Sequence, residues 1–361
     1  MVPSYFHFPI SIIMRKKILL SAVTVVVIII TAIAGASVYM LDYSLASDTN
    51  RHDVDSAYKV LYHQIPDMKP WIDSLRNRKL LRDTFVTMPS GERHHAILLR
   101  NDSAHGRTAV IVHGYKDCSI KFLYLGRMYH RDLGFNILLP DLHGHGLSEG
   151  DNIQMGWKDR LDIKRWTEIA AGTFADSTHG TSVVVHGVSM GAATTMCLSG
   201  EALPDYVRCF VEDCGYTSVW DEFSGQLSEQ FGLPEFPLLY STSILCRLVN
   251  GWSFGEASPL RQVAQCNRPM LFIHGDADTF VPFSMMQRLY DAKRGEKEMW
   301  IAKGTHHAAS YLDYPHEYTE KVRDFLNVAT LQDQPYILAR DIAGPSSIHC
   351  RYRNRLTRLF T

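Results

Sequence analysis

A serine placed between two glycines is the first candidate for chemistry in this sequence. Residues 187–191 read GVSMG, which matches the pattern G-x-S-x-G. The apolar run 183–185 precedes them, and the helix-like stretch 192–198 follows. Between a buried strand and a helix this turn is so tight that only glycines fit beside the serine, which is pushed out at the helix N-terminus. We therefore predict that Ser189 is the nucleophile of an acyl-transfer reaction.

A nucleophilic serine needs a base, and the base needs an orienting carboxylate. Downstream, a strand-like run ends in the sequence HGDADTFVP, which carries two acids. Asp278 is the predicted carboxylate because of its spacing to the following Val-Pro, whereas Asp276 is interpreted as a turn former. The later sequence GTHHAAS offers two adjacent histidines. We predict His307 as the base, with His306 as the alternative.

The oxyanion of an acyl-transfer intermediate needs two backbone N–H donors. One is expected from Met190, which follows the nucleophile, and the other from the loop after the third strand. That loop is residues 112–117, and Tyr115 is its predicted donor. The nearby His113 is interpreted as a structural histidine.

Metal and nucleotide sites have little support in the sequence. His143 and His145 stand two residues apart, but no carboxylate or third histidine lies at ligand spacing, and the surrounding glycines indicate a shaped loop. No glycine-rich nucleotide motif occurs. We therefore predict no metal and no cofactor.

The cysteines leave two alternatives open. The sequence has 7 of them, with no CxxC spacing that would indicate a metal site. In an exported domain a disulfide such as Cys209–Cys214 or Cys246–Cys266 could form. Buried free thiols are the other interpretation.

Apolar runs of strand length alternate with amphipathic stretches of helix length from about residue 81. Several runs are continuous rather than alternating, which is typical of strands buried on both faces of a parallel sheet. We therefore predict an α/β fold with a mostly parallel central sheet flanked by helices. The strand-like runs are 96–99, 108–112, 135–139, 182–185, 207–211, 270–273 and 298–301, and the clearest helix-like stretches are 120–133, 157–171 and 191–199.

The alternation breaks between residues 215 and 264. This segment is rich in aromatic residues and is long for a simple crossover. It is either a small helical cap over the site or a long connection whose helices pack on the sheet.

An uncharged apolar segment occupies residues 18–41. As a helix it would span roughly 36 Å, enough to cross a bilayer core of about 30 Å. Basic residues 15–17 precede it, so the positive-inside rule places the N-terminus in the cytoplasm and the rest of the chain outside it. Cleavage as a signal peptide near 34–36, which would release a secreted protein, is the alternative.

Composition and pattern together divide the chain into five parts. The formal net charge of −1 gives no electrostatic support for nucleic acid as a partner. The predicted parts are a short N-terminal segment (1–17), a transmembrane anchor (18–41), a linker with lead-in helices (42–80), the α/β domain (81–327) and a C-terminal tail (328–361).

With these motifs in place, the chain resembles the α/β-hydrolase superfamily, in particular its bacterial branch related to serine aminopeptidases and monoglyceride lipases. The resemblance covers about residues 80–327 and includes the sequence PDLHGHGLS at 140–148. Many relatives have arginine where this chain has His143, which leaves the assignment of Ser189, Asp278 and His307 unchanged.

The expected activity is hydrolysis of an ester through an acyl-enzyme on Ser189. A peptidase, a thioesterase and an acyltransferase use the same three residues and remain alternatives. A peptidase needs a carboxylate for the substrate amine, and Glu222, Glu229 and Glu235 are available. A catalytically silent binding protein is the alternative of another class, and the intact set of three residues argues against it. The expected partners are a small acyl ester or short peptide and the membrane, and not nucleic acid.

Overall fold

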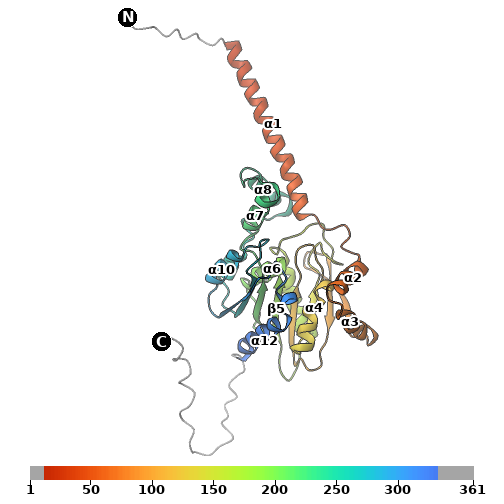
Figure 1. The fold of residues 1–361 in the computed structure, drawn as a ribbon. Helices are drawn as coiled ribbons and strands as arrows, with labels where there is room; N and C mark the ends of the chain where they lie inside the picture. The colour runs from red at the N-terminus through yellow and green to blue at the C-terminus, as the bar shows by residue number, and fades with distance from the viewer. Residues whose placement is uncertain (1–11, 332–361) are drawn as a thin grey trace, which may run out of the picture.

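The computed structural model describes residues 12–331, and an eight-stranded sheet lies at its centre (Figure 1). The strand order is β1-β2-β4-β3-β5-β6-β7-β8; β1–β2 and β2–β4 are antiparallel, and the other pairs are parallel. The predicted α/β fold with a mostly parallel sheet is therefore confirmed. The strands are β1 (Arg82–Thr87), β2 (Arg93–Leu99), β3 (Arg107–Val112), β4 (Asn136–Pro140), β5 (Ser182–Val188), β6 (Val207–Asp213), β7 (Met270–Gly275) and β8 (Lys297–Ala302).

Helices cover both faces of this sheet and form two separate apolar cores. One core contains side chains of α1, α5, α6, α7, α8 and α10, and the other contains side chains of α2, α3, α4 and α12. The helical elements are α1 (Ile12–Leu45), α2 (Val54–Gln64), α3 (Met68–Asn77), η1 (Ser119–Phe122), α4 (Leu123–Arg127), η2 (Met128–Asp132), α5 (Asp159–Thr173), α6 (Met190–Ser199), α7 (Val219–Phe231), α8 (Leu238–Asn250), α9 (Pro259–Val263), α10 (Phe283–Ala292), α11 (Ser310–Asp313) and α12 (Pro315–Leu331).

Two elements differ from the sequence-based prediction. Strand β1 was not predicted, because it pairs only with β2 at the sheet edge and its partly exposed residues RDTFVT lack a continuous apolar run. The helix predicted over 120–133 is divided into η1, α4 and η2.

The segment 215–264 contains three helices with different surroundings. Helices α7 and α8 stand away from the sheet and beside the lower end of α1, whereas α9 packs against α6 in the body of the domain (Figure 1). Only α7 and α8 are therefore placed as a cap, and we call these two helices the cap below.

Helix α1 starts before and ends after the predicted segment 18–41. It is the one helix in residues 12–331 that is long and apolar enough to cross a membrane. Its side chains are exposed from Met14 through Ala32, whereas Leu41 and Leu45 near its end are buried in the domain core. The helix is therefore both a candidate span and, in its last turns, a part of the domain.

The six cysteines within the described residues are free and buried, so the two disulfides considered above are absent from this part of the chain. Burial raises the pKa of Cys209 to about 12, which keeps its thiol protonated. The predicted segment 1–17 lies mostly outside the described residues, as does most of the predicted tail 328–361, of which the structure describes only the end of α12.

Candidate active site

Ser189 occupies the tight turn between β5 and α6. Its backbone has φ 57° and ψ −119°, a conformation that L-residues rarely adopt. A Cβ on Gly187 would lie 2.0 Å from the carbonyl oxygen of Gly191, and one on Gly191 would lie 2.1 Å from that of Val112. Both flanking glycines are thus sterically required, and together they hold the serine at the N-terminus of α6.

The structure brings the three predicted catalytic residues together. Oγ of Ser189 lies 2.8 Å from Nε2 of His307, and Nδ1 of His307 lies 2.7 Å from Oδ2 of Asp278. They come from the ends of β5 and β7 and from the segment after β8, which share the carboxyl edge of the parallel sheet. The arrangement can pass a proton from the hydroxyl to the imidazole while the carboxylate fixes the orientation of the ring.

Asp278 is held as an anion although it is buried. Its Oδ1 accepts the backbone N–H groups of Phe280 and Val281 at 3.0 and 2.9 Å, and Nε2 of His274 lies 3.3 Å from its Oδ2. Burial alone would raise the pKa of Asp278, but the side-chain hydrogen bonds from His274 and His307 outweigh it and hold this pKa well below its usual value. A permanent anion is what stabilises an imidazolium on His307.

The two alternative residues lie outside this relay. Asp276 accepts the backbone N–H of Gly304 at 2.6 Å and pairs with Lys303 at 3.1 Å, which ties two loops together. His306 is exposed, and its Nδ1 lies 3.1 Å from the carbonyl oxygen of Ala277. Neither side chain contacts Ser189 in the structure.

The predicted oxyanion donors border the nucleophile. Met190 is the first residue of α6, so its N–H has no partner within the helix. Tyr115 and Met190 both line the pocket that contains Ser189, and a Cβ on Gly114 would lie 3.6 Å from that of Ser189. The hydroxyl of Tyr115 donates to the carbonyl of Ser44 in α1 at 2.8 Å, so the oxyanion loop is tied to α1.

Two buried histidines support that loop. Nδ1 of His113 lies 2.8 Å from the carbonyl oxygen of Gly114, and its Nε2 accepts the N–H of Leu142 at 3.0 Å. His145 accepts the N–H of Lys116 at 3.2 Å. Burial lowers the pKa of His145 to about 3, so its ring is neutral and can accept this bond. Both histidines shape the loop through backbone contacts.

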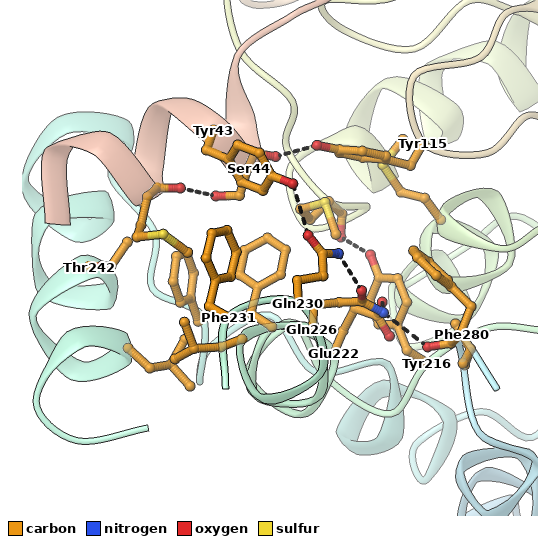
Figure 2. Close-up of a pocket in the computed structure, with 18 of the residues that line it drawn as sticks. Tyr43, Ser44, Tyr115, Tyr216, Glu222, Gln226, Gln230, Phe231, Thr242 and Phe280 are labelled. Carbon is orange, nitrogen blue, oxygen red and sulfur yellow. Dashed lines mark hydrogen bonds between the residues drawn. The ribbon is translucent and has the colours of Figure 1, made fainter. Parts of the chain in front are cut away.

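A cavity of about 320 Å³ opens beside Ser189 and is lined mostly by apolar side chains. Its walls come from three parts of the chain: the sheet edge, the cap and the end of α1 (Figure 2). The α1 side chains are Met40, Tyr43 and Ser44. Sequence analysis did not predict that α1 would contribute to the site.

One polar ladder crosses this apolar cavity. On α7, Glu222, Gln226 and Gln230 follow each other at spacing four and so share one helix face. Gln230 accepts the hydroxyl of Tyr43 at 2.8 Å and donates to Gln226 at 2.7 Å, and Gln226 lies 3.3 Å from Glu222 (Figure 2). Gln226 also donates to the carbonyl of Phe280 at 3.2 Å. The ladder connects α1 with the vicinity of the triad.

Glu222 is the one of the three proposed cap carboxylates that lines the cavity. It is 4% exposed, and burial raises its pKa to about 8. At neutral pH its side chain is therefore mostly a neutral acid, which can both donate and accept hydrogen bonds. Glu235 instead accepts a hydrogen bond from Ser224 within the cap.

A second cluster could present atoms to a metal ion. Nδ1 of His143 lies 3.0 Å from the carboxylate of Glu92, which directly precedes β2. The same carboxylate is 3.7 Å from the buried His94 on β2. Burial lowers the pKa of His94 to about 4, which leaves the neutral imidazole that metals bind. Folding brings Glu92 and His94 to His143 from about 50 residues away, so the spacing near His143 and His145 could not reveal this cluster, and His145 is not part of it. The absence of a bound metal stays a prediction.

Among sequence relatives, the chain is 31% identical to the uncharacterized protein YqkD of Bacillus subtilis over 223 residues, which are 61% of this chain and 71% of that one. It is 25% identical to the uncharacterized membrane protein YNL320W of Saccharomyces cerevisiae over 209 residues, 57% of this chain and 65% of that one. Neither name gives an activity.

Solved structures with the same fold include several hydrolases. The Pyrococcus furiosus esterase Pf2001 superposes with a TM-score of 0.56 at 21% identity, covering 71% of this chain and 95% of the esterase. The Pyrococcus horikoshii acylaminoacyl peptidase gives a TM-score of 0.50 at 16% identity, covering 71% of this chain and 43% of the peptidase. The profile of the alpha/beta hydrolase family matches residues 109–321, more than half of the chain. The chain therefore belongs to the alpha/beta hydrolase family and has a hydrolase fold.

Proposed function

We propose that this protein is a serine hydrolase that cleaves a carboxylic ester through an acyl-enzyme. The observation that carries the proposal is the continuous contact from Ser189 through His307 to Asp278, at 2.8 and 2.7 Å. Ser189 Oγ attacks the ester carbonyl while His307 takes its proton, and His307 returns that proton to the leaving alkoxide. Water then attacks the acyl-enzyme with His307 as base, which releases the acid and restores the serine.

The negative charge of each tetrahedral intermediate is stabilised by the backbone N–H groups of Tyr115 and Met190. A donor of this kind contributes about 2.7–4 kcal/mol to lowering the barrier. The anionic Asp278 stabilises the imidazolium that forms at the same moment. The oxyanion and the imidazolium are thus each stabilised by groups at the carboxyl edge of the sheet.

The pocket supports an ester more than a peptide as substrate. A peptidase that grips a substrate ammonium needs a carboxylate anion, whereas burial keeps Glu222, the cap acid that reaches the cavity, mostly neutral at pH 7. The remaining lining is largely apolar, which suits an acyl chain. Thioester cleavage and acyl transfer to another alcohol use the same relay and are the alternatives.

The experiment is a substrate panel with the full chain and its Ser189→Ala variant. We expect turnover of p-nitrophenyl acetate by the wild type and a loss of at least about 10⁴-fold in the variant. Peptide and thioester substrates in the same panel rank the alternatives. If the variant keeps its turnover of the short ester, the proposal fails.

We further propose that α1 anchors the enzyme in a membrane with the hydrolase domain on the non-cytoplasmic side. Its length and apolarity, the basic residues 15–17 before it, and the name of the yeast relative support this. Secretion after cleavage near 34–36 is the alternative. Accessibility of the domain to protease in intact cells and in inverted vesicles tests the side.

A further inference from the structure

The end of α1 is built into the substrate pocket. Met40, Tyr43 and Ser44 line the cavity beside Ser189, and the carbonyl of Ser44 holds the hydroxyl of Tyr115 in the oxyanion loop. A helix that served only as a tether would not need to enter the site. Here the candidate span ends as one wall of the cavity (Figure 2).

Direct contacts join this wall to both cap helices. Tyr43 packs edge-on against Phe231 of α7, with ring centroids 5.6 Å apart. Ser37 lies closer to the bilayer and forms a hydrogen bond of 2.7 Å with Ser241 of α8. The cap therefore contacts α1 at two positions along that helix, at Ser37 and at Tyr43.

Helix geometry gives the depth of these contacts relative to the bilayer. A helix rises 1.5 Å per residue, so a hydrocarbon core of about 30 Å that begins at Ile18 ends about 20 residues later, near Ser37. Tyr43 then lies about 9 Å further on, just outside a headgroup layer that is about 5–7.5 Å thick. Tyr39 and Tyr43 are exposed tyrosines at this boundary, where membrane helices commonly carry them. The cavity wall and the adjoining cap thus lie at the membrane surface.

The cap presents an apolar stripe at the same place. On α8, Tyr240, Ile244 and Leu248 follow each other at spacing four and are 49, 63 and 78% exposed. Phe236, just before the helix, is 72% exposed and its ring lies 5.9 Å from that of Tyr240. A contiguous exposed apolar surface of this kind marks an interaction site. Because α8 packs against the membrane-crossing helix (Figure 1), the surface available to cover this stripe is the adjoining leaflet.

We propose that the stripe on α8 lies in the leaflet around α1 and that the substrate is a membrane-resident amphiphile with an acyl ester. This inference rests on the proposed esterase activity and names its substrate class. The substrate enters from the leaflet past Tyr43 and Phe231. Its acyl chain lies against the apolar wall formed by α1 and the cap, and its polar group meets the ladder of Glu222, Gln226 and Gln230.

The test compares an ester dissolved in water with one dissolved in a bilayer. The full chain is reconstituted in phosphatidylcholine vesicles, with p-nitrophenyl acetate as the soluble ester and 4-methylumbelliferyl oleate as the embedded one. Ile244→Glu/Leu248→Glu places two charges on the stripe at positions that make no core contact. The matched control is Val328→Glu, at a residue 51% exposed on α12, at the far end of the domain from α1 (Figure 1).

We expect the double variant to hydrolyse the embedded ester at least fivefold more slowly than the wild type and the acetate within twofold of it, with the Val328 variant unchanged on both. Equal rates on the embedded ester, or no hydrolysis of that ester by the wild type, overturn the inference while the esterase proposal stands. Failure on both esters instead contradicts the esterase proposal.

A second measurement does not depend on activity. An environment-sensitive fluorophore is attached to Leu248→Cys or Val328→Cys in a Cys350→Ser background, since the other cysteines are buried. Brominated lipid should quench the label at 248 and not the label at 328. A label at 248 that is as exposed to water as the one at 328 shows that the stripe does not enter the leaflet, and the inference fails.

Discussion

Two regions of the molecule meet at Ser189 and differ in construction. The carboxyl edge of the sheet supplies the relay, with Ser189 and Asp278 fixed by strands, required glycines and backbone hydrogen bonds. The opposite wall consists of the cap and α1, which contact each other through few polar bonds and leave apolar side chains exposed. The sheet edge carries the proposed chemistry, and the helical region forms the wall against which we propose that the substrate binds.

This difference separates what is common to the family from what is particular to this chain. A parallel sheet with a tight β5–α6 turn brings together the positions after β5, β7 and β8, and in this chain these positions hold Ser189, Asp278 and His307. The wall made by α1 depends on Tyr43 and Ser44 meeting the cap and Tyr115. Variants at the sheet edge should therefore lower kcat for any ester, whereas variants in the cap or α1 should chiefly change which substrates are hydrolysed.

The largest effect is expected at the carboxylate of the relay. Asp278→Asn keeps the size of the side chain but removes the charge that stabilises the His307 imidazolium, and we expect kcat for p-nitrophenyl acetate to fall by about 10⁴-fold. The matched variant Asp276→Asn alters the loop contacts with Gly304 and Lys303, which lie outside the relay, and should stay within about threefold, the effect of weakened hydrogen bonds. Comparable losses in both variants would contradict the assignment of the relay.

A smaller effect is expected where the two regions are tied together. Tyr115→Phe removes the hydrogen bond to Ser44 while keeping the ring and the backbone N–H, so the oxyanion loop loses one anchor. We expect kcat for the short ester to fall about three- to tenfold, in keeping with one neutral hydrogen bond. Tyr39→Phe removes a hydroxyl from the same helix, at a side chain that is 60% exposed and does not line the cavity, and serves as the control, with kcat unchanged. If Tyr115→Phe has no effect, α1 does not position that loop.

The smallest catalytic effect is expected at Glu222. Its pKa of about 8 lies above the usual 4.5, so the folded chain retains a proton that the unfolded chain releases. The stability that this group contributes is complete below about pH 4.5 and is lost as pH rises toward 8. The side chain in Glu222→Gln cannot ionise, so the variant does not lose this stability. The free energy of unfolding of the variant relative to the wild type should therefore rise from pH 5 to pH 8, by at most about 1.4 kcal/mol per pH unit. Melting temperatures of both proteins across this range measure the change.

The same variant distinguishes the substrate classes. Glutamine resembles the neutral acid in shape and hydrogen-bonding capacity, so ester turnover at pH 7 should change by less than about threefold. A peptidase that binds its substrate ammonium through this carboxylate would instead lose affinity, seen as a rise in KM for an amino-terminal peptide substrate. A pH-independent difference in melting temperature would show that Glu222 is ionised in the folded chain.

The sheet and the proposed triad could be predicted because their signals are local. Apolar runs of strand length marked seven of the eight strands, and each proposed catalytic residue directly follows a strand-like run or its loop. Strand β1 was missed because an edge strand needs no continuous apolar run. Asp276 and Asp278 stand two residues apart and differ only in which atoms folding places near them.

The pocket wall could not be predicted because its contacts join distant segments. Ser37 meets Ser241, and Tyr43 meets Gln230, across 204 and 187 residues of sequence. Glu92 and His143 come together across 51 residues. A partial signal did exist in Glu222, Gln226 and Gln230, whose spacing of four predicts one helix face. Nothing local indicates that this face points toward α1.

Covalent labelling shows directly whether Ser189 is the nucleophile that we propose. The full chain is treated with a fluorophosphonate, which reacts with serines activated by an adjacent base, and the adduct is located by peptide mass spectrometry. We expect one adduct, on the peptide containing Ser189, that is lost in Asp278→Asn and retained in Asp276→Asn. No adduct, or an adduct on another serine, would contradict the proposal.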